Sequence, residues 1–381
     1  MNIFKLIIAI LLMTAGTIVA GGQEIDFIQL GENHIQLNGD DWSGLRSKIH
    51  NLASCPGGKF NIVQIGDSHI QPGILTDQVR TALQRAYGNG GRGLIAPLAL
   101  AGTNEPRDYV IRSTASVTSK SRLMSRTWPV ENGLTGVSVQ FGGERTDLTL
   151  VAKHNEDAFS NVTLFHAPRE GYESARVGDD VVFARQSSPY TSQFTLQSAT
   201  GEVTLAGLPC AAPFYGAYLL NNRRGVVVSE IGNNGATCAL YNKVDNWAAQ
   251  LKLLQPQLVI ISLGTNEAYG NPSAMATSLD RLVRNIKQQM PAVKILLVTP
   301  VETQKGNGRT GTARVREIIL DYGRRNHIAV WDMYQVCGGQ GSSSQWLNMG
   351  LMNNADKLHQ LEPGYTLQGM LLGDALLEAF K

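Results

Sequence analysis

The chain has 381 residues, of which 43% are hydrophobic, and carries 33 basic against 31 acidic side chains. This near-neutral balance, without a basic block or a zinc-ligand spacing, excludes a typical nucleic-acid-binding protein and suits an uncharged or glycan substrate better than a polyanion. The length exceeds that of one ordinary domain, so we expect more than one.

The first twenty residues have the pattern of a secretory signal peptide. Lys5 supplies the charge of a short n-region, residues 6–13 form an apolar h-region, and Ala20 ends a cleavable segment. The apolar run is short for a membrane span, although an uncleaved N-terminal anchor is the alternative. We expect secretion across the inner membrane, a periplasmic or cell-envelope location, and no membrane span after cleavage.

The four cysteines are Cys55, Cys210, Cys238 and Cys337, which are far apart and contain no C-x-x-C pair. In an oxidising compartment they can form two disulfides among three possible pairings. Buried free thiols are the alternative, and the sequence does not decide between the two or identify a pairing.

An apolar run from Phe60 to Ile65, bounded by glycines, predicts a short buried strand. It leads into Gly66-Asp67-Ser68-His69, and we expect the next helix at about residues 72–87. A serine that ends a strand and opens a helix projects its hydroxyl into solvent, with helix N–H groups nearby. Ser68 is therefore a candidate nucleophile, whereas Asp67 is assigned only a role in the geometry of the turn.

The pattern of apolar and polar residues changes after this helix. Ser68 and Gly235 lie 167 positions apart, far more than one helix and a short connection need in a doubly wound sheet. Short runs that alternate apolar with polar residues, separated by turn residues, predict an all-β sandwich. These runs are residues 108–111, 136–141, 147–151, 161–165, 192–196 and 202–205. We expect residues 106–223 to form an inserted domain, and residues 21–105 and 224–381 to form one discontinuous catalytic domain.

Two more apolar runs, residues 226–228 and 258–263, precede short segments that contain Gly235 and Asn266. In an open parallel α/β sheet, ligands bind in the crevice beyond the carboxyl ends of the strands. A glycine lets a backbone N–H approach a substrate oxygen, and an asparagine amide is a neutral donor, so both suit an oxyanion hole. Ordinary left-handed turns and helix caps are the alternative reading of these segments.

The rest of the chain alternates helices with strands. Apolar residues between 279 and 290 recur at helical spacing, residues 294–298 and 328–331 predict strands, and residues 364–380 predict a closing helix. This order predicts a parallel sheet of about five strands between two helix layers, in a flavodoxin-like arrangement.

Asp356 and His359 lie three residues apart in a polar loop before the last helix, so one loop can deliver both side chains. With Ser68 they complete the inventory of Ser-His-Asp catalysis: nucleophile, general base and orienter. His359 has a carboxylate at i−3, unlike the other six histidines; His69 neighbours the nucleophile, and adjacent side chains diverge. Ile70, two positions after the serine, argues against the G-x-S-x-G elbow of α/β-hydrolases.

Ser68, Gly235, Asn266 and His359 fall in order at the four signature positions of the SGNH (GDSL-like) hydrolases. The local sequences Gly-Asp-Ser-His, Asn-Gly-Ala-Thr, Gly-Thr-Asn-Glu and Asp-x-x-His most resemble the bacterial peptidoglycan O-acetylesterase branch. The resemblance covers about residues 57–105 and 225–381, and it extends to an inserted β-sandwich. It departs at two positions, His69 and Glu267, where many relatives have leucine and aspartate.

The resemblance implies an α/β protein with the three-layer α/β/α SGNH fold and an inserted, carbohydrate-binding-module-like β-sandwich. It also implies a catalytic triad of Ser68, Asp356 and His359, and an oxyanion hole formed by Ser68, Gly235 and Asn266. No cofactor and no metal are expected.

The expected function is that of a serine esterase that removes O-acetyl groups from a cell-wall polysaccharide, above all O-acetylated peptidoglycan, through an acyl-enzyme. The insert is expected to hold the polymer beside the cleft without taking part in bond breaking. The alternatives are an O-acetylesterase for another acetylated polysaccharide, such as a plant glycan or capsule, and a glycan-binding protein with a vestigial hydrolase domain.

Overall fold

The structure is a computed structural model that describes residues 12–14, 17–20, 23–168 and 171–381. Much of the predicted signal segment therefore lies outside the described residues. Three short strands follow one another at this end as a small antiparallel sheet: β1 (Leu12–Thr14), β2 (Thr17–Ala20) and β3 (Gln23–Glu24). Within the described ranges, no helix has the length and apolar character to cross a membrane.

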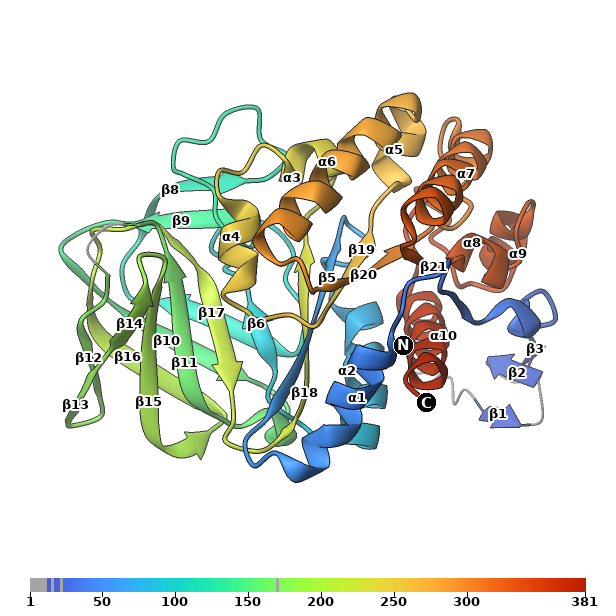
Figure 1. Cartoon of the computed structure of the whole chain (residues 1–381). Coiled ribbons are helices and arrows are strands. Elements are labelled where there is room, and N and C mark those ends of the chain that lie inside the picture. Colours follow the sequence, from blue (N-terminus) through green and yellow to red (C-terminus); the bar gives the residue numbers. More distant parts are fainter. Residues whose placement is uncertain (1–11, 15–16, 21–22, 169–170) are drawn as a thin grey trace, which may run out of the picture.

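A six-stranded sheet forms the centre of the α/β part (Figure 1). Its spatial order is β18-β5-β19-β20-β21-β4, and the first five strands are parallel. In chain order these five read 2-1-3-4-5, so the predicted flavodoxin-like sheet is confirmed. The sixth strand, at the edge and antiparallel, was not predicted, because its two residues are too few to show a pattern. The strands are β4 (Ile35–Gln36), β5 (Lys59–Gly66), β18 (Gly225–Gly232), β19 (Leu258–Ser262), β20 (Lys294–Val298) and β21 (Ala329–Trp331).

Helices cover both faces of this sheet. Successive residues of each strand point to opposite faces, so apolar residues of one strand belong to two different hydrophobic cores. Val63 and Ile65 of β5 belong to a core that includes residues of α3, α4, α6 and α7. Phe60 and Ile62 of the same strand belong to a second core, with residues of α1, α2 and α10. The helices are α1 (Ser43–His50), α2 (Ile74–Tyr87), α3 (Cys238–Tyr241), α4 (Trp247–Lys252), α5 (Thr265–Tyr269), α6 (Ser273–Gln289), α7 (Gly308–Asn326), α8 (Met333–Val336), α9 (Ser342–Asn348) and α10 (Glu362–Ala379). Short 3-10 turns lie at Leu30–Glu32, Asn51–Ser54 and Asn155–Asp157.

The middle of the chain folds as two antiparallel sheets, of five and seven strands, which enclose a third core (Figure 1). Leu150, Phe159 and Phe194 are fully buried between these sheets. All six runs with alternating polarity lie in strands, as predicted. The strands after β6 are β7 (Tyr109–Ser113), β8 (Val117–Arg122), β9 (Val137–Phe141), β10 (Arg145–Ala152), β11 (Phe159–His166), β12 (Ser174–Val177), β13 (Asp180–Phe183), β14 (Arg185–Ser188), β15 (Thr191–Thr200), β16 (Glu202–Pro209) and β17 (Phe214–Leu220).

One strand of the seven-stranded sheet comes from the segment that the sequence assigned to the catalytic domain. β6 (Gly93–Ile95) pairs with β17, although it precedes the expected boundary at residues 105 and 106. Three buried residues are too few to show a period, so the sequence pattern could not assign this strand.

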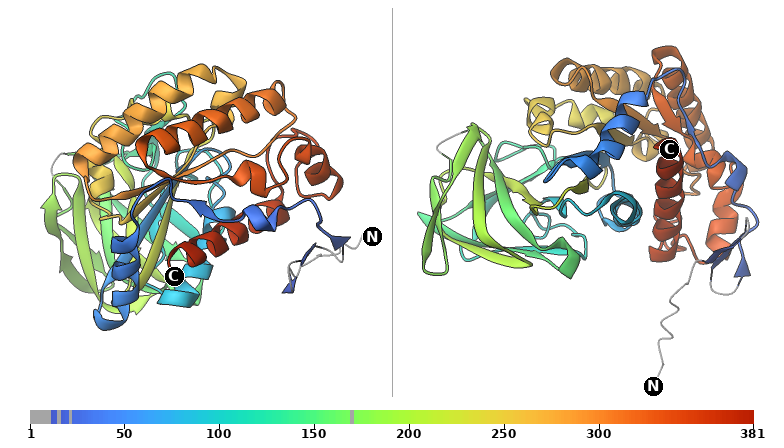
Figure 2. Two further views of the ribbon diagram at one scale, coloured as in Figure 1. Left: turned by 45° about the vertical axis from the view of Figure 1, so that its right-hand side comes forward. Right: turned by 60° about the horizontal axis from the view of Figure 1, so that its bottom comes forward.

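The β-sandwich shares a hydrophobic core with the α/β part, which it adjoins in both views of Figure 2. Leu123 and Leu134 of the insert belong to the same buried cluster as Tyr241 and Trp247. The Trp247 Nε1–H donates to the Leu134 carbonyl at 2.9 Å, and the Gln250 side-chain oxygen accepts from the Leu134 N–H at 2.9 Å. The insert is therefore built into the catalytic domain.

All four cysteines are free thiols, so the structure contains none of the possible disulfides. Cys210, Cys238 and Cys337 are buried, and Cys55 is exposed. Of the two alternatives left open by the sequence, the structure has buried free thiols at three positions.

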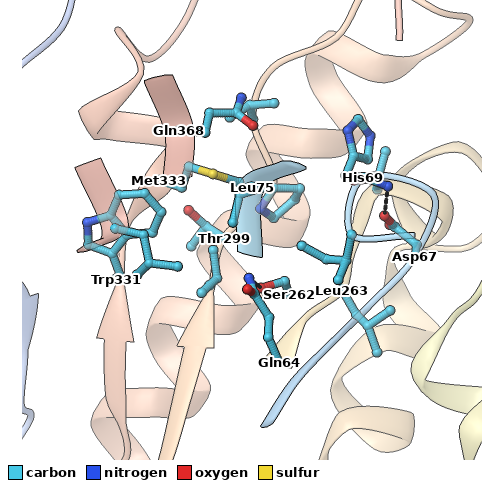
Figure 3. A pocket seen from close by; sticks show the side chains of 16 residues that line it. Gln64, Asp67, His69, Leu75, Ser262, Leu263, Thr299, Trp331, Met333 and Gln368 are labelled. Carbon is cyan, nitrogen blue, oxygen red and sulfur yellow. Dashed lines mark hydrogen bonds between the residues drawn. The ribbon is translucent and has the colours of Figure 1, made fainter. Parts of the chain in front are cut away.

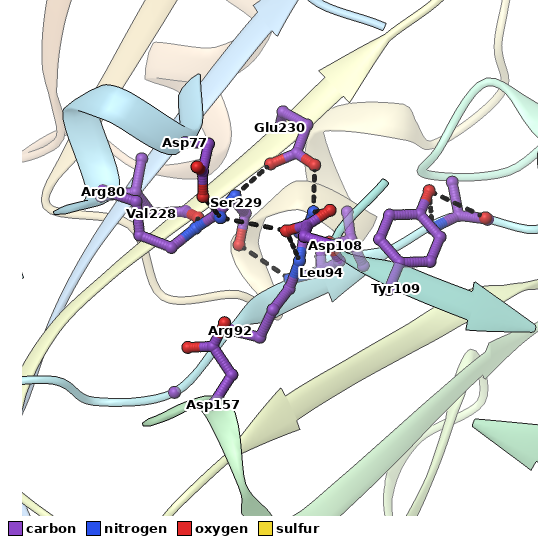
Figure 4. Close-up of polar contacts among 12 residues, drawn as sticks. Asp77, Arg80, Arg92, Leu94, Asp108, Tyr109, Asp157, Val228, Ser229 and Glu230 are labelled. Carbon is purple, nitrogen blue, oxygen red and sulfur yellow. Dashed lines mark hydrogen bonds and ion pairs between the residues drawn. The ribbon is translucent and has the colours of Figure 1, made fainter. Parts of the chain in front are cut away.

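A network of buried ion pairs crosses the boundary between the two parts (Figure 4). Arg80 of α2 pairs with Asp108 at 3.1 Å and with Glu230 of β18 at 2.8 Å. Arg92 donates to both carboxylate oxygens of Asp108, at 2.9 and 3.1 Å, and also pairs with Glu230. Burial alone raises the pKa of Asp108, but Arg92 and Arg80 outweigh it and hold that pKa far below its usual range.

We expect Asp108→Asn to lower the free energy of unfolding at pH 7 by about 3–5 kcal/mol, because Arg80 and Arg92 then share Glu230 and lose the other buried carboxylate that compensates their charge. The carboxylate has a lowered pKa in the folded chain, so its stabilisation is present above about pH 4 and declines as pH falls further. The difference in unfolding free energy between Asp108→Asn and the unmodified protein should therefore become smaller at acidic pH.

Urea unfolding at pH 7 and in acid measures both effects. Asp77→Asn is the matched control, since Asp77 also pairs with Arg80 but its side chain is 33% exposed. If both variants lose the same small amount of unfolding free energy, the buried network does not have the proposed stabilising role.

Candidate active site

Ser68 lies in a tight turn at the carboxyl end of β5. The Asp67 carbonyl accepts the Gln71 N–H at 3.0 Å, and α2 begins only at Ile74. The expectation that Ser68 opens this helix is therefore wrong. Gly73, at the helix N-cap, has a left-handed backbone with φ +78°, which separates the turn from the helix.

Two glycines let the nucleophile turn sit directly against the strand ends. Gly66 and Gly232 are register partners in the β5–β18 pair. A Cβ at Gly232 would overlap the backbone of Gln71, and one at Gly66 would overlap Ile70. The turn that carries Ser68 therefore needs glycine at both positions for close approach.

Ser68, His359 and Asp356 form one hydrogen-bonded chain. The Ser68 Oγ lies 2.8 Å from His359 Nε2, and His359 Nδ1 lies 2.8 Å from Asp356 Oδ2. An ionised Asp356 accepts only, which assigns the ring proton to Nδ1 and leaves Nε2 free to accept from the serine hydroxyl. The structure thus brings together the three residues predicted as a triad.

The loop that carries Asp356 is held by its own backbone. Asp356 Oδ1 accepts the N–H groups of Leu358 and His359 at 2.9 and 3.1 Å. Asn353 N–H donates to the His359 carbonyl at 2.9 Å and closes the loop. Partial burial raises the pKa of Asp356, but hydrogen bonds from the His359 ring and the two N–H groups outweigh it, so the net pKa is lowered. The carboxylate therefore stays ionised beside the imidazole.

Gly235 and Asn266 lie beside each other at the ends of the next two strands. Gly235, with φ +74°, follows β18, and Asn266 lies in the first turn of α5. The Asn266 amide donates to the carbonyl of Ala236 at 2.9 Å, and its nitrogen lies 3.4 Å from Asp67 Oδ2. The second contact is long, so this side of the amide is only weakly engaged.

Asp67 lies buried under the nucleophile turn. Its Oδ1 accepts the His69 N–H at 2.9 Å, which agrees with the geometric role expected for it. Burial raises its pKa to about 7, and the carboxylate of Glu267 adds to the rise. Glu267 in turn accepts the backbone N–H of Cys238 at 2.8 Å, at the start of α3. Glu267, one of the two residues that depart from the family pattern, therefore links α5 to the start of α3.

From the sequence, His69 was expected only to shape or line the site. In the structure it is buried against His359. The two rings lie 5.3 Å apart, and His69 Nδ1 lies 3.2 Å from the hydroxyl of Tyr365 on α10. Burial and then the charge of His359 lower the pKa of His69 to about 3. His69 is therefore a neutral, tightly packed neighbour of the base.

A small cavity of about 20 Å³ lies behind the nucleophile turn (Figure 3). Asp67, His69, Thr299, Trp331 and Gln368 are among the residues that line it. This volume holds about one water molecule, so the cavity is too small to be the substrate site. No cluster of metal-ligating side chains occurs in the described ranges of the chain.

Comparisons with known proteins agree with this geometry. The family model of the GDSL-like Lipase/Acylhydrolase family matches residues 200–367, which include Gly235, Asn266, Asp356 and His359 and exclude Ser68. No curated protein matches the chain.

Among solved structures, one described as a peptidoglycan O-acetylesterase is 24% identical, with a TM-score of 0.77 over 91% of this chain and 99% of its own. A lipase/acylhydrolase from Enterococcus faecalis is 21% identical, with a TM-score of 0.33 over 41% of this chain and 78% of its own. A carbohydrate esterase family 3 protein from Talaromyces cellulolyticus is 15% identical, with a TM-score of 0.33 over 42% of this chain and 74% of its own.

Residues 200–367 thus match a GDSL-like lipase/acylhydrolase domain, and the chain has an SGNH-type fold with an additional β-domain. It is a carboxylic ester hydrolase.

The lowered pKa of His69 predicts a pH-dependent stability difference. The folded chain binds a proton at His69 more weakly than the unfolded chain, so this residue destabilises the fold progressively as pH falls below about 6.5 toward 3. As pH falls from 6 to 4, the unfolding free energy of His69→Gln should rise relative to that of the unmodified protein by about 1 kcal/mol for each pH unit, because the variant lacks this titrating group. Urea unfolding measures it, and a constant difference across this range would contradict the assignment.

Proposed function

We propose that this enzyme removes O-acetyl groups from a cell-wall polysaccharide, and that its substrate is O-acetylated peptidoglycan. The observation that carries the proposal is the hydrogen-bonded arrangement of Ser68, His359 and Asp356 at the edge of an SGNH-type sheet. The β-domain beside this edge and the fold shared with a peptidoglycan O-acetylesterase support the choice of a polymeric, acetylated glycan.

In the proposed reaction, Ser68 Oγ attacks the acetyl carbonyl while His359 Nε2 takes its proton. Asp356 keeps the imidazole oriented and stabilises the imidazolium that forms. His359 then protonates the departing sugar hydroxyl, and the acetyl group remains on the serine. Water, activated by the same imidazole, releases acetate in the second half of the cycle.

The tetrahedral oxyanion is proposed to be held by the N–H groups of Ser68 and Gly235 and by the amide of Asn266. The amide has one N–H committed to the Ala236 carbonyl, and its other N–H has only the long contact with Asp67. That weakly engaged N–H can turn to a developing negative charge without the loss of a good hydrogen bond.

The site of action that we propose follows from the N-terminal sequence. The signal peptide predicted at residues 1–20 supports a location in the periplasm or the cell envelope, where peptidoglycan is found.

Acetate release is the direct test. The unmodified enzyme is expected to release acetate from O-acetylated peptidoglycan faster than from acetylated xylan, and Ser68→Ala and His359→Ala should lose almost all activity on both and on an aryl acetate. More than a few per cent of activity in a folded Ser68→Ala protein would overturn the mechanism. A preference for xylan would favour another acetylated polysaccharide, and no activity on any ester would favour a glycan-binding protein.

Asn266→Ala should lower kcat by about 10²-fold or more with little change in KM, because its donor acts mainly in the transition state. Steady-state kinetics on an aryl acetate separates the two constants. A raised KM with an unchanged kcat would make Asn266 a ground-state binding residue instead.

A further inference from the structure

A hollow of about 260 Å³ lies where the insert meets the loop that carries Gly235. Its catalytic-domain side includes Gln71, three positions after Ser68, and Asn234, next to Gly235. Its insert side includes Arg122, at the end of β8, and Met124. The volume is somewhat below the range of about 300–1,000 Å³ typical of small-molecule sites, so it fits one substituent of a polymer rather than a long segment.

The catalytic side of the hollow is a network of side-chain amides that bond to one another. Gln71 Oε1 accepts the Asn234 N–H at 2.7 Å. Asn104 Oδ1 accepts from the side-chain amides of both Gln71 and Asn234, at 2.8 Å each. Thr103 Oγ1 accepts from the same two amides, so this network is largely satisfied within itself, and the charge that selects a ligand has to come from the insert side.

The insert adds positive charge to the rim. Arg122 and Lys120 lie two positions apart on β8, and both are exposed on the same face of that strand. Arg122 Nη1 has one long contact, at 3.4 Å with the Gly102 carbonyl, and the Lys120 ammonium lies against the same glycine. Neither side chain is in an ion pair with any described residue.

An exposed methionine lies on the side of the hollow next to Gly235. Met124 is 61% exposed, and its sulfur lies so close to Gly235 that a Cβ there would overlap it. A ligand in the hollow would therefore lie next to the loop assigned to the oxyanion hole.

We propose that this hollow is a second substrate subsite, in which Arg122, supported by Lys120, binds a carboxylate on a substituent of the acetylated glycan. The planar guanidinium matches a carboxylate with two parallel hydrogen bonds. The inference rests on the proposed function and extends it: the enzyme distinguishes a glycan with carboxylate-bearing substituents from a neutral acetylated glycan.

The test compares O-acetylated peptidoglycan with the same material after carbodiimide amidation, which converts its carboxylates to neutral amides. Arg122→Gln should lower kcat/KM on the native glycan by about tenfold more than on an aryl acetate, mainly through KM, as expected for loss of a charge-assisted hydrogen bond. Amidation should slow the unmodified enzyme by a similar factor and have little further effect on Arg122→Gln. Arg122→Lys keeps the charge and loses the planar guanidinium, so its kcat/KM on the native glycan should lie between the values of the unmodified enzyme and Arg122→Gln.

Arg185→Gln is the matched control, because Arg185 is an exposed arginine of the insert on β14 that does not line the hollow. Digestion with an amidase locates the charge, because it removes the peptide carboxylates and frees the ether-linked carboxyl group that is amide-bonded to the peptide in the intact glycan. If the effect of Arg122→Gln disappears after digestion, a peptide carboxylate is bound; if the effect persists, the subsite also accepts the newly freed carboxylate.

An unmodified enzyme that acts equally on native and amidated glycan would overturn the subsite. So would an Arg122→Gln variant whose loss is the same on the native glycan, the amidated glycan and the aryl acetate. These results differ from failure of the proposed function itself, in which the unmodified enzyme hydrolyses the aryl acetate and releases no acetate from peptidoglycan.

Discussion

Two buried arginines connect the β-domain to the central sheet, and the arrangement of the rest of the structure depends on them. Arg80 and Arg92 have side-chain exposures of 2% and 0%, and a guanidinium can be buried to this degree only when carboxylates surround it. The carboxylates come from both parts of the molecule: Asp108 from the start of the insert and Glu230 from the central sheet. The β-domain and the sheet must therefore fold as one unit.

This constraint extends into the active site. Glu230 lies on β18, the strand that leads into the loop of Gly235. The same loop is held from the insert, since the Asn233 side chain donates to the Thr135 carbonyl at 3.0 Å, and Met124 lies against Gly235. The insert, which the sequence predicts to hold the polymer, thus also supports the loop assigned to the oxyanion hole. Removal of the insert would expose part of the catalytic core and free one wall of the oxyanion loop, so single substitutions are the better probe of its role.

The central sheet was predictable because its strands are long enough to show their apolar runs, and a helix-strand order of this kind allows few topologies. The residues of the triad were predictable because Asp356 and His359 lie in one loop and match a known pattern with Ser68. The buried network was not, because Arg80 and Glu230 are 150 positions apart and nothing in either local sequence indicates the other. The helix α2 begins within two residues of its predicted start at residue 72, whereas the tight turn that carries Ser68 before it was not predicted, since it depends on the left-handed backbone at Gly73, which the sequence permits without requiring.

Whole-chain charge and local charge lead to different conclusions about the substrate. A near-neutral total argues against a long polyanion such as a nucleic acid, whose recognition depends on many neutralised phosphates. It says little about one carboxylate, because salt screens exposed charges beyond about 8–10 Å and recognition at that scale depends on the few groups within reach. At the hollow beside Gly235 those groups include Arg122, with Lys120 two positions before it on β8, while the side-chain amides of Gln71 and Asn234 bond to Thr103 and Asn104. A protein with a near-neutral total charge can therefore be selective for a negatively charged glycan, because Arg122 lies beside the loop assigned to the oxyanion hole and, like Lys120, forms no ion pair with any described residue.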